Sequence, residues 1–178
     1  MTIQEQIRAK AAEYRDYTAL NLSKMVKVKS YSSQEEDVCR LIVTLCEEAG
    51  FDEVRIDGLG SVIGRVGNGP KKLAFDAHID TVEVGNLKNW DFDPFSGEIK
   101  DGKVWGRGSS DQKGGAASMI TAGRILKELG YGGEYTVYFT FTVMEEDCDG
   151  MCWKYLIEEE NFRPDSVVST EPTRCRLY

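Results

Sequence analysis

The side chains best suited to chemistry are one histidine and several carboxylates, which fall in four short segments of the sequence. The segments are AHIDTV, with His78; SSDQKGG, with Asp111; VMEED, with Glu145 and Glu146; and STEPT, with Glu171. Each is predicted to lie at the end of a strand or directly after one. Because open α/β sheets bind ligands outside the carboxyl ends of their strands, we expect these groups to converge on one rim.

So many acids around one imidazole repel one another strongly unless cations neutralise them. Two divalent ions with oxygen and imidazole ligands would do so, and a carboxylate that ligates through both oxygens, for which Asp111 is the candidate, would bridge them. Of the adjacent Glu145 and Glu146, one can bind metal while the other serves as the base for water. Asp80 follows His78 on the same side of the strand and can hold the imidazole tautomer.

Each segment also has an ordinary structural interpretation. A lone histidine at a strand end is more often structural than a ligand, and an acidic run such as EED is usually a solvated loop. The segment GRGSSD looks like a dinucleotide fingerprint, but Asp111 stands where the third glycine belongs and would face a pyrophosphate, so nucleotide binding is rejected. Cys148 and Cys152 have no second cysteine pair and are interpreted as ordinary thiols.

Hydrophobic periodicity predicts the helices that must position these groups. Helical spacing covers the chain to about Val28, and Ser32 or Ser33 is expected to cap a second helix that ends at Gly50. A further helix is predicted over residues 112–129, and MCWKYLIEEE is expected to form another.

The strands are predicted from short apolar runs divided by glycine and proline. One strand ends at His78, EYTVYFTFTV alternates as a buried strand, and DSVVST forms another, while residues 90–108 are expected to be a loop. The alternation of strands and helices predicts an α/β fold, with a mixed sheet flanked by helices on both faces.

Composition limits the class of protein. The chain has 178 residues, which fit one ordinary domain, and 41% of them are hydrophobic, enough for a core. A net charge of −8 disfavours nucleic acid and membrane surfaces as partners. No apolar run of signal-peptide or membrane-spanning type occurs, which predicts a cytoplasmic location. The five cysteines are irregularly spaced, which indicates reduced thiols.

Taken together, the four segments resemble the M20 family of zinc peptidases and deacylases, which includes acetylornithine deacetylase and succinyl-diaminopimelate desuccinylase. The match lies in order and context, because AHIDTV, WDFDPFSGEIKDGKVWGRGSSDQKGG, FTVMEEDCDG and STEPT follow one another over residues 73–173. The segment EEDCDGMCW resembles a branch of bacterial hydrolases, some of them labelled selenium-metabolism hydrolases, more than it resembles the named biosynthetic enzymes. The resemblance implies a zinc-dependent exopeptidase-like catalytic domain that is incomplete.

The resemblance also implies a ligand set. His78 and Glu171 would bind the first metal, Glu146 would bind the second, and Asp111 would bridge the two. The implied cofactor is Zn²⁺ at two sites in the parent protein, for which Co²⁺ or Mn²⁺ can substitute. In such proteins the peptide bond after the bridging aspartate is often cis.

The implied reaction is hydrolysis of an amide bond in a small N-acyl amino acid or short peptide. Glu145 would act as general base, taking a proton from the attacking water and passing it to the leaving amine. Asp80 would be the partner of His78. The parent protein is expected to be a homodimer.

One departure from the family pattern is serious. Family members have a further histidine ligand near the C-terminus, after a lid domain that carries dimer contacts, whereas His78 is the single histidine here. Residues 1–178 are therefore expected to be the N-terminal portion of a catalytic domain, with weak or no activity alone. A non-enzymatic metal-binding or scaffold module is the alternative, and a redox protein using Cys148 and Cys152 is a weaker third hypothesis.

Overall fold

A five-stranded sheet forms the centre of the molecule, in a computed structural model that describes residues 1–173. The strand order is β1-β2-β6-β3-β7. The strands are β1 (Glu53–Ile56), β2 (Val62–Val66), β3 (Lys71–His78), β6 (Tyr135–Thr142) and β7 (Ser166–Ser169). β3 runs parallel to β6 and β7, whereas β2 is antiparallel to β1 and β6, so the predicted mixed sheet is confirmed.

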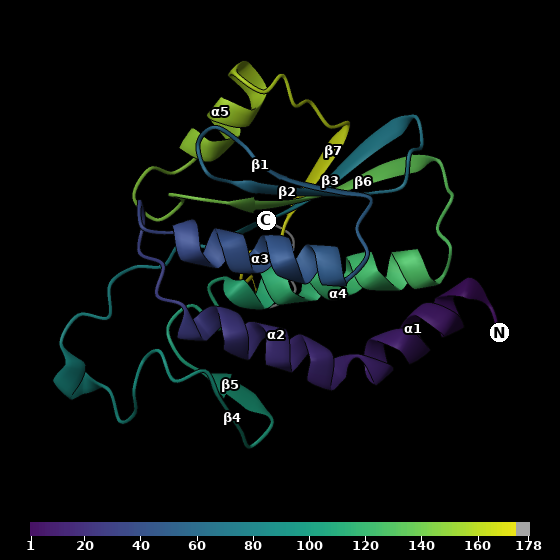
Figure 1. Ribbon diagram of the computed structural model, residues 1–178. Helices are drawn as coiled ribbons and strands as arrows, with labels where there is room; N and C mark the ends of the chain where they lie inside the picture. The colour runs from purple at the N-terminus through teal and green to yellow at the C-terminus, as the bar shows by residue number, and fades with distance from the viewer. Residues whose placement is uncertain (174–178) are drawn as a thin grey trace.

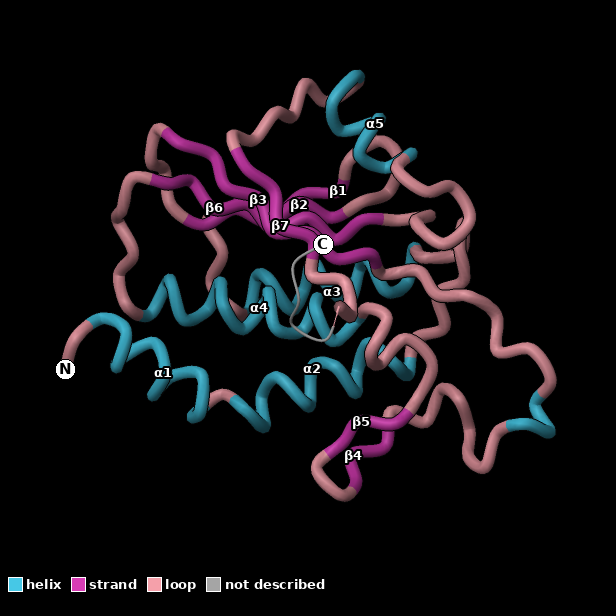
Figure 2. The backbone as a smooth tube through the Cα atoms, turned by 180° about the vertical axis from the view of Figure 1, so that it is seen from behind, coloured by secondary structure: helices cyan, strands magenta, loops and turns pink. Residues whose placement is uncertain are grey.

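Helices cover both faces of this sheet (Figure 1). On one side lie α1 (Ile3–Glu13), α2 (Arg15–Lys27), α3 (Glu36–Glu48) and α4 (Lys113–Glu128), and on the other lies α5 (Met151–Glu158). The view from behind shows α3 and α4 next to the sheet and α1 and α2 as an outer layer (Figure 2). The predicted α/β fold with helices on both faces is therefore confirmed.

The main core lies between the sheet and the helices α3 and α4. The buried residues of α3 recur three or four positions apart, as one face of a helix requires, and they are Val38, Cys39, Ile42, Leu45 and Cys46. They pack with strand residues such as Phe139 and Phe141, and a smaller cluster around Leu156 and Phe162 lies under α5. Each large apolar side chain removed from water contributes about 1.5–3 kcal/mol, so these clusters hold the layers together.

Two predictions about the N-terminal helices were wrong. The first helical stretch is two helices, because Tyr14 leaves helical geometry between α1 and α2 with φ −88° and ψ 11°. Neither Ser32 nor Ser33 caps the next helix, since the N-cap of α3 is Glu35. The Ser32 hydroxyl instead donates a hydrogen bond to Asp80, at 2.7 Å, and Ser33 adopts a left-handed conformation with φ 66°.

The segment predicted as a loop over residues 90–108 contains a small hairpin. Its strands are β4 (Glu98–Lys100) and β5 (Lys103–Trp105), which pair antiparallel, and a short 3₁₀ helix, η1 (Leu87–Asn89), precedes it. Asp101 and Gly102 form the turn, both at positive φ, and this local turn chemistry was not recognised. No helix within residues 1–173 has both the length and the apolar character needed to cross a membrane.

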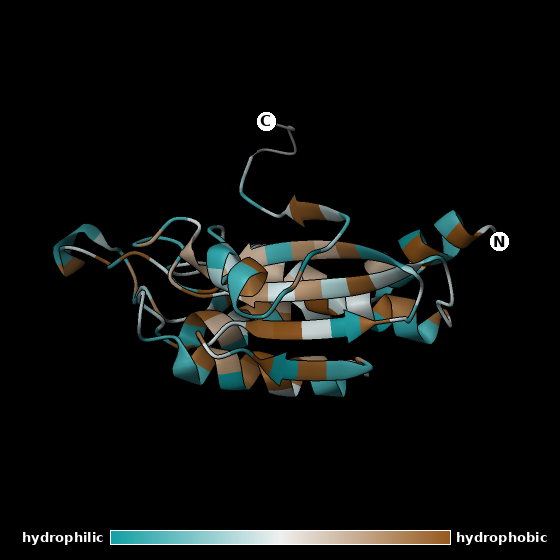
Figure 3. Ribbon diagram, turned by 90° about the horizontal axis from the view of Figure 1, so that it is seen from above, coloured by the Kyte–Doolittle hydropathy of each residue, from teal (hydrophilic) through white to brown (hydrophobic). Residues whose placement is uncertain are grey.

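β7 lies at one edge of the sheet (Figure 3). Its residues Val167 and Val168 are 45% and 44% exposed, and no other strand in residues 1–173 pairs with its outer side. Beside this edge, an apolar groove of about 910 Å³ opens between α1, α4 and the sheet. None of the six candidate site residues lines the groove, so it is separate from the site described next.

Candidate metal centre

Three parallel strands deliver candidate residues to one rim of the sheet. β3 ends at His78, β6 ends shortly before Glu145 and Glu146, and β7 ends shortly before Glu171. Asp111 comes from the turn that leads into α4. Ligating atoms of His78, Asp111 and Glu146 all lie within 4.8 Å of one another, so the predicted convergence is present in the structure for these three.

The imidazole of His78 is the centre of this group. Its ring is 2% exposed, and its Nε2 lies 3.0 Å from Asp111 Oδ1 and 3.8 Å from Glu145 Oε2. On the other side of the ring, Nδ1 lies 3.1 Å from the Asp80 carbonyl oxygen and 3.4 Å from Asp80 Oδ1. A carbonyl oxygen can only accept, so Nδ1 carries the hydrogen and Nε2 is directed towards the carboxylates.

The surrounding acids hold a proton on His78 when no metal neutralises them. Burial lowers the pKa of the imidazole, but hydrogen bonds to Asp80 and Asp111 raise it, and the result is a pKa of about 9 against an ordinary 6.5. A cation among these carboxylates is therefore favoured electrostatically, whether it is a proton or a metal ion.

The carboxyl groups of the rim are shifted in different directions. Burial is the main cause that raises the pKa of Glu145, with Glu171 and Glu146 adding repulsion while His78 lowers it. Burial likewise raises the pKa of Glu171. Burial also acts to raise the pKa of Asp80, but hydrogen bonds from His78 and Ser32 outweigh it, so the pKa is lowered. Burial therefore raises the pKa of Glu145 and Glu171 more than the repulsion between carboxylates that the sequence suggested.

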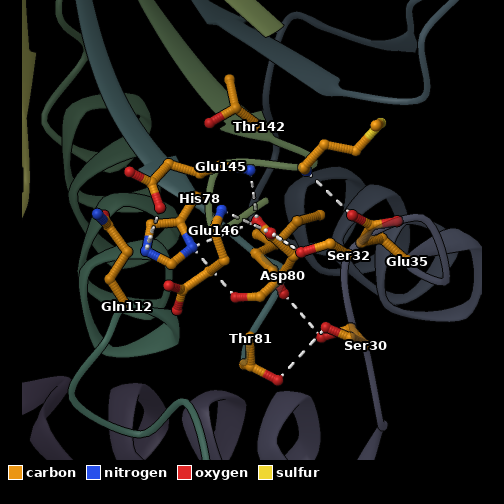
Figure 4. A network of polar contacts seen from close by, with 12 residues as sticks. Ser30, Ser32, Glu35, His78, Asp80, Thr81, Gln112, Thr142, Glu145 and Glu146 are labelled. Atoms are coloured by element: carbon orange, nitrogen blue, oxygen red, sulfur yellow. Dashed lines mark hydrogen bonds and ion pairs between the residues drawn. The ribbon is translucent and has the colours of Figure 1, made fainter. Parts of the chain in front are cut away.

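Asp80 lies behind the imidazole and is completely buried. Its carboxylate accepts a hydrogen bond from the Ser32 hydroxyl and from the backbone N–H groups of Glu145 and Glu146, at 3.1 and 3.0 Å (Figure 4). The predicted position beside His78 is present in the structure. The same carboxylate also holds the turn that carries two other candidate residues, which the sequence did not indicate.

Glu171 is bound to Gln112, the residue that follows Asp111. The fully buried Gln112 donates from Nε2 to Glu171 Oε1, and its Oε1 accepts from the Thr170 hydroxyl at 2.9 Å. The Asp111–Gln112 peptide bond is cis, as the resemblance implied. Glu171 is not among the three residues whose ligating atoms lie together, but Asp111 and His78 both influence its pKa.

Lys113 is a further buried group beside the site that sequence reasoning missed. It is 1% exposed, and its Nζ donates to the carbonyl oxygens of Met25 and Val28 at 3.1 and 2.9 Å. Burial lowers its pKa to about 8. It thereby binds carbonyl groups at the C-terminal end of α2.

Comparison with known proteins decides the family. The sequence profile of peptidase family M20/M25/M40 matches residues 74–176, which contain all six candidate residues. The chain belongs to this family.

Two curated relatives show how the chain compares with M20-type sequences. It is 52% identical over 172 residues to uncharacterized protein YgeY of Escherichia coli K12, covering 97% of this chain and 43% of that protein. It is 32% identical over 162 residues to a probable succinyl-diaminopimelate desuccinylase of Staphylococcus epidermidis, covering 88% of this chain and 40% of the relative. The chain thus spans less than half the length of these relatives.

Two solved structures have the same fold. The dipeptidase Dug1p of Saccharomyces cerevisiae matches with a TM-score of 0.81 at 20% identity, over 94% of this chain and 40% of that protein. The YxeP protein of Bacillus subtilis, a dinuclear metal binding peptidase from the M20 family, matches with a TM-score of 0.65 at 20% identity, over 89% of this chain and 43% of that one.

The residues present fit a divalent ion. One imidazole nitrogen and two carboxylates within 4.8 Å of one another are a nitrogen and oxygen donor set of the type that Zn²⁺ accepts. The Nδ1 hydrogen bond of His78 orients the ring as metal-binding histidines require. The M20 family is a family of metallopeptidases and related hydrolases, and this donor set is consistent with that membership.

Proposed function

We propose that the parent protein is a metal-dependent hydrolase that cleaves the amide bond of a small N-acyl amino acid or short peptide. The observation that carries the proposal is the approach of His78, Asp111 and Glu146 on the rim of a sheet that has the M20 fold. Residues 1–178 are then the N-terminal portion of its catalytic domain.

The proposed ligand set has two metal ions and four side chains. His78 and Glu171 would hold the first ion, Glu146 would hold the second, and Asp111 would bridge them. Zn²⁺ is the proposed ion because imidazole and carboxylate oxygens are its common ligands, and Co²⁺ or Mn²⁺ can occupy the same donors.

Bound ions would polarise the scissile carbonyl group and make water more acidic. Glu145 is proposed as the general base, because its carboxylate lies on the same rim and is not needed as a ligand. It takes a proton from the water that attacks the carbonyl carbon and delivers this proton to the leaving amine as the C–N bond breaks. Asp80 holds His78 and the turn of Glu145 in place throughout.

The proposed substrate class follows from what the relatives are called. One curated relative is a probable desuccinylase of an N-acylated diamino acid, and one matched structure is a dipeptidase, so both amide and peptide bonds are candidates. A homodimeric parent and a cytoplasmic location remain predictions.

A second candidate is a metal-binding module without catalysis of its own. The observation that favours it is that His78 is the single histidine of the chain, so a second ion has only carboxylates as protein ligands here. Metal binding and turnover must therefore be tested separately.

The deciding experiment compares the wild type with Glu145→Gln. Each is titrated with Zn²⁺, and each is assayed on a panel of N-acyl amino acids and dipeptides with Zn²⁺ or Co²⁺, both as this chain and in the parent protein. We expect both proteins to bind Zn²⁺, while turnover falls by about 10²- to 10⁴-fold in the variant because the proton acceptor is lost.

Glu134→Gln is the matched control, since Glu134 is an exposed glutamate whose partner is Lys71. Its turnover should equal that of the wild type. Zn²⁺ binding with no turnover in the parent protein would favour the non-catalytic module, and a chain that binds no Zn²⁺ would contradict both candidates.

A further inference from the structure

The turn after β6 carries both Glu145 and Glu146, and its backbone is held by carboxylates from two other parts of the chain. Three successive N–H groups donate to them. Met144 N–H donates to Glu35 Oε1 at 3.0 Å, while the N–H groups of Glu145 and Glu146 donate to the two oxygens of Asp80, at 3.1 and 3.0 Å (Figure 4).

Successive N–H groups that point into one concavity form a site for negative charge. Here the negative charge comes from side chains of the protein itself. The three bonds fix three consecutive peptide groups, and these fix the directions in which the Glu145 and Glu146 side chains leave the backbone. Met144 takes up a left-handed conformation, φ 62°, that is uncommon for a residue other than glycine, so the turn depends on such support.

The carboxylate of Glu35 binds the turn after β6 and does not cap its own helix. Glu35 is 5% exposed although it is a glutamate, and it is the N-cap residue of α3. A capping carboxylate would accept from the first N–H groups of its own helix, but Glu35 makes no such bond. Its carboxylate is bound instead to Met144, which lies 109 residues further along the chain.

The two supports differ in what else they contact. Asp80 also contacts His78, so its substitution disturbs the imidazole directly. Glu35 has no hydrogen bond to any of the proposed ligands among the described contacts. Its hydrogen bond to Met144 links it to the turn, and its charge also repels that of Asp80.

We propose that Glu35 is a positioning residue of the hydrolytic site: by binding the Met144 N–H group it sets the turn that directs Glu145 and Glu146 towards His78. The consequence for hydrolysis rests on the proposed function, whereas the consequence for the turn does not.

The test uses Glu35→Ala, which removes the acceptor, and Glu35→Gln, whose amide oxygen can still accept from Met144. Glu36→Ala is the matched control, because Glu36 is the adjacent exposed glutamate and pairs with Arg40. Amide hydrogen exchange is measured by NMR on the metal-free chain. The visible spectrum of the Co²⁺-loaded chain is a second measurement.

Glu35→Ala should speed exchange at Met144, Glu145 and Glu146 by about 10-fold, which corresponds to the loss of one hydrogen bond. Exchange beyond this turn and the Ser33 and Glu35 amides, which also lie against the carboxylate, should stay as in the wild type. Glu35→Gln and Glu36→Ala should match the wild type throughout. The Co²⁺ spectrum should change in Glu35→Ala and be restored in Glu35→Gln.

Unchanged exchange at the three amides in Glu35→Ala would overturn the proposal, as would an increase of equal size across the whole chain. If Glu35→Ala does not fold, Glu35→Asp takes its place, since it keeps the charge but shortens the side chain by one methylene. Faster exchange confined to the turn would support the proposal, and unchanged exchange would overturn it. A wild-type chain that binds no Co²⁺ contradicts the proposed function alone, because the exchange measurement needs no metal.

Discussion

At the scale of single residues, His78 is the most informative group, because one imidazole reports on the whole cluster. Its Nε2 faces Asp111 and Glu145, and its Nδ1 faces Asp80. Its signals in an NMR spectrum need no assignment by mutation, since no other histidine is present.

We predict that His78 titrates near pH 9 in the metal-free chain, in contrast to the ordinary 6.5. The folded pKa is the higher one, so protonation stabilises the fold: the contribution is complete below pH 6.5 and is lost as pH rises through about 9. NMR titration of the imidazole, with chemical unfolding between pH 6 and 9, checks both statements. A pKa at or below 6.5 would contradict the described contacts.

The thiols provide a second test at this scale. Burial raises the pKa of Cys39 to about 12 and that of Cys152 to about 11, and Cys46 is raised further still. These three should not react with an aromatic disulfide reagent at pH 8 in the native chain, whereas all five cysteines should react after denaturation. Fast native reaction of Cys152 together with Cys148 would revive the redox hypothesis.

At the scale of elements, the sheet and α4 come together through a gap that glycines leave open. Phe51 packs against Gly64 of β2 and Gly123 of α4, and a Cβ atom built on Gly123 would meet the Phe51 ring at 2.2 Å. The ring also lies 5.1 Å from that of Phe139. The sheet and α4 can therefore approach Phe51 closely only because Gly64 and Gly123 have no side chain.

We predict that Gly123→Ala destabilises the fold although alanine favours helices. The gain in helix propensity is about 1 kcal/mol, whereas overpacking against the ring costs about 1–3 kcal/mol. Urea unfolding should show a net loss. The double variant Gly123→Ala with Phe51→Leu should be more stable than Gly123→Ala alone, and a simple gain in Gly123→Ala would show that the gap is not needed.

Most elements could be predicted from local patterns, and the exceptions have physical causes. The strand ending at His78, the helix over residues 112–129 and the strand in EYTVYFTFTV lie within one or two residues of β3, α4 and β6. Apolar periodicity carries that information. Ser32 was misjudged as a helix cap, and Glu35 was not singled out, because their side chains bind partners far along the chain, Asp80 and Met144. Such contacts have no local signal.

At the scale of the whole molecule, ligand binding and stability are linked. An ion that binds the folded chain and not the unfolded one stabilises it by about 2.7 kcal/mol at a hundred times its dissociation constant. We therefore predict that excess Zn²⁺ raises the melting temperature of the chain and that a chelator reverses the rise.

Asp111→Asn is the control for this prediction, since it removes a candidate bridging carboxylate while keeping the shape of the side chain. Its melting temperature should respond much less to Zn²⁺. An equal response in the two proteins would mean that the ion binds somewhere other than the rim.

The convergence of the site could be predicted at this scale, but its internal arrangement could not. Parallel strands end at one rim, which follows from the alternation of strands and helices, and this brought His78 and Glu146 together. Asp111 joins them from the turn before α4 and not from a strand of the main sheet. Glu171 is held beside this group by its hydrogen bond with the buried amide of Gln112, which no sequence pattern indicated.

Asp80 serves the imidazole with one set of contacts and the turn of Glu145 and Glu146 with another. Substitutions near the ring and substitutions in the turn both alter the contacts of this carboxylate. Their effects on the free energy of unfolding should therefore be non-additive. A substitution beside His78 should therefore alter the cost of a substitution in the turn, and the reverse should hold as well.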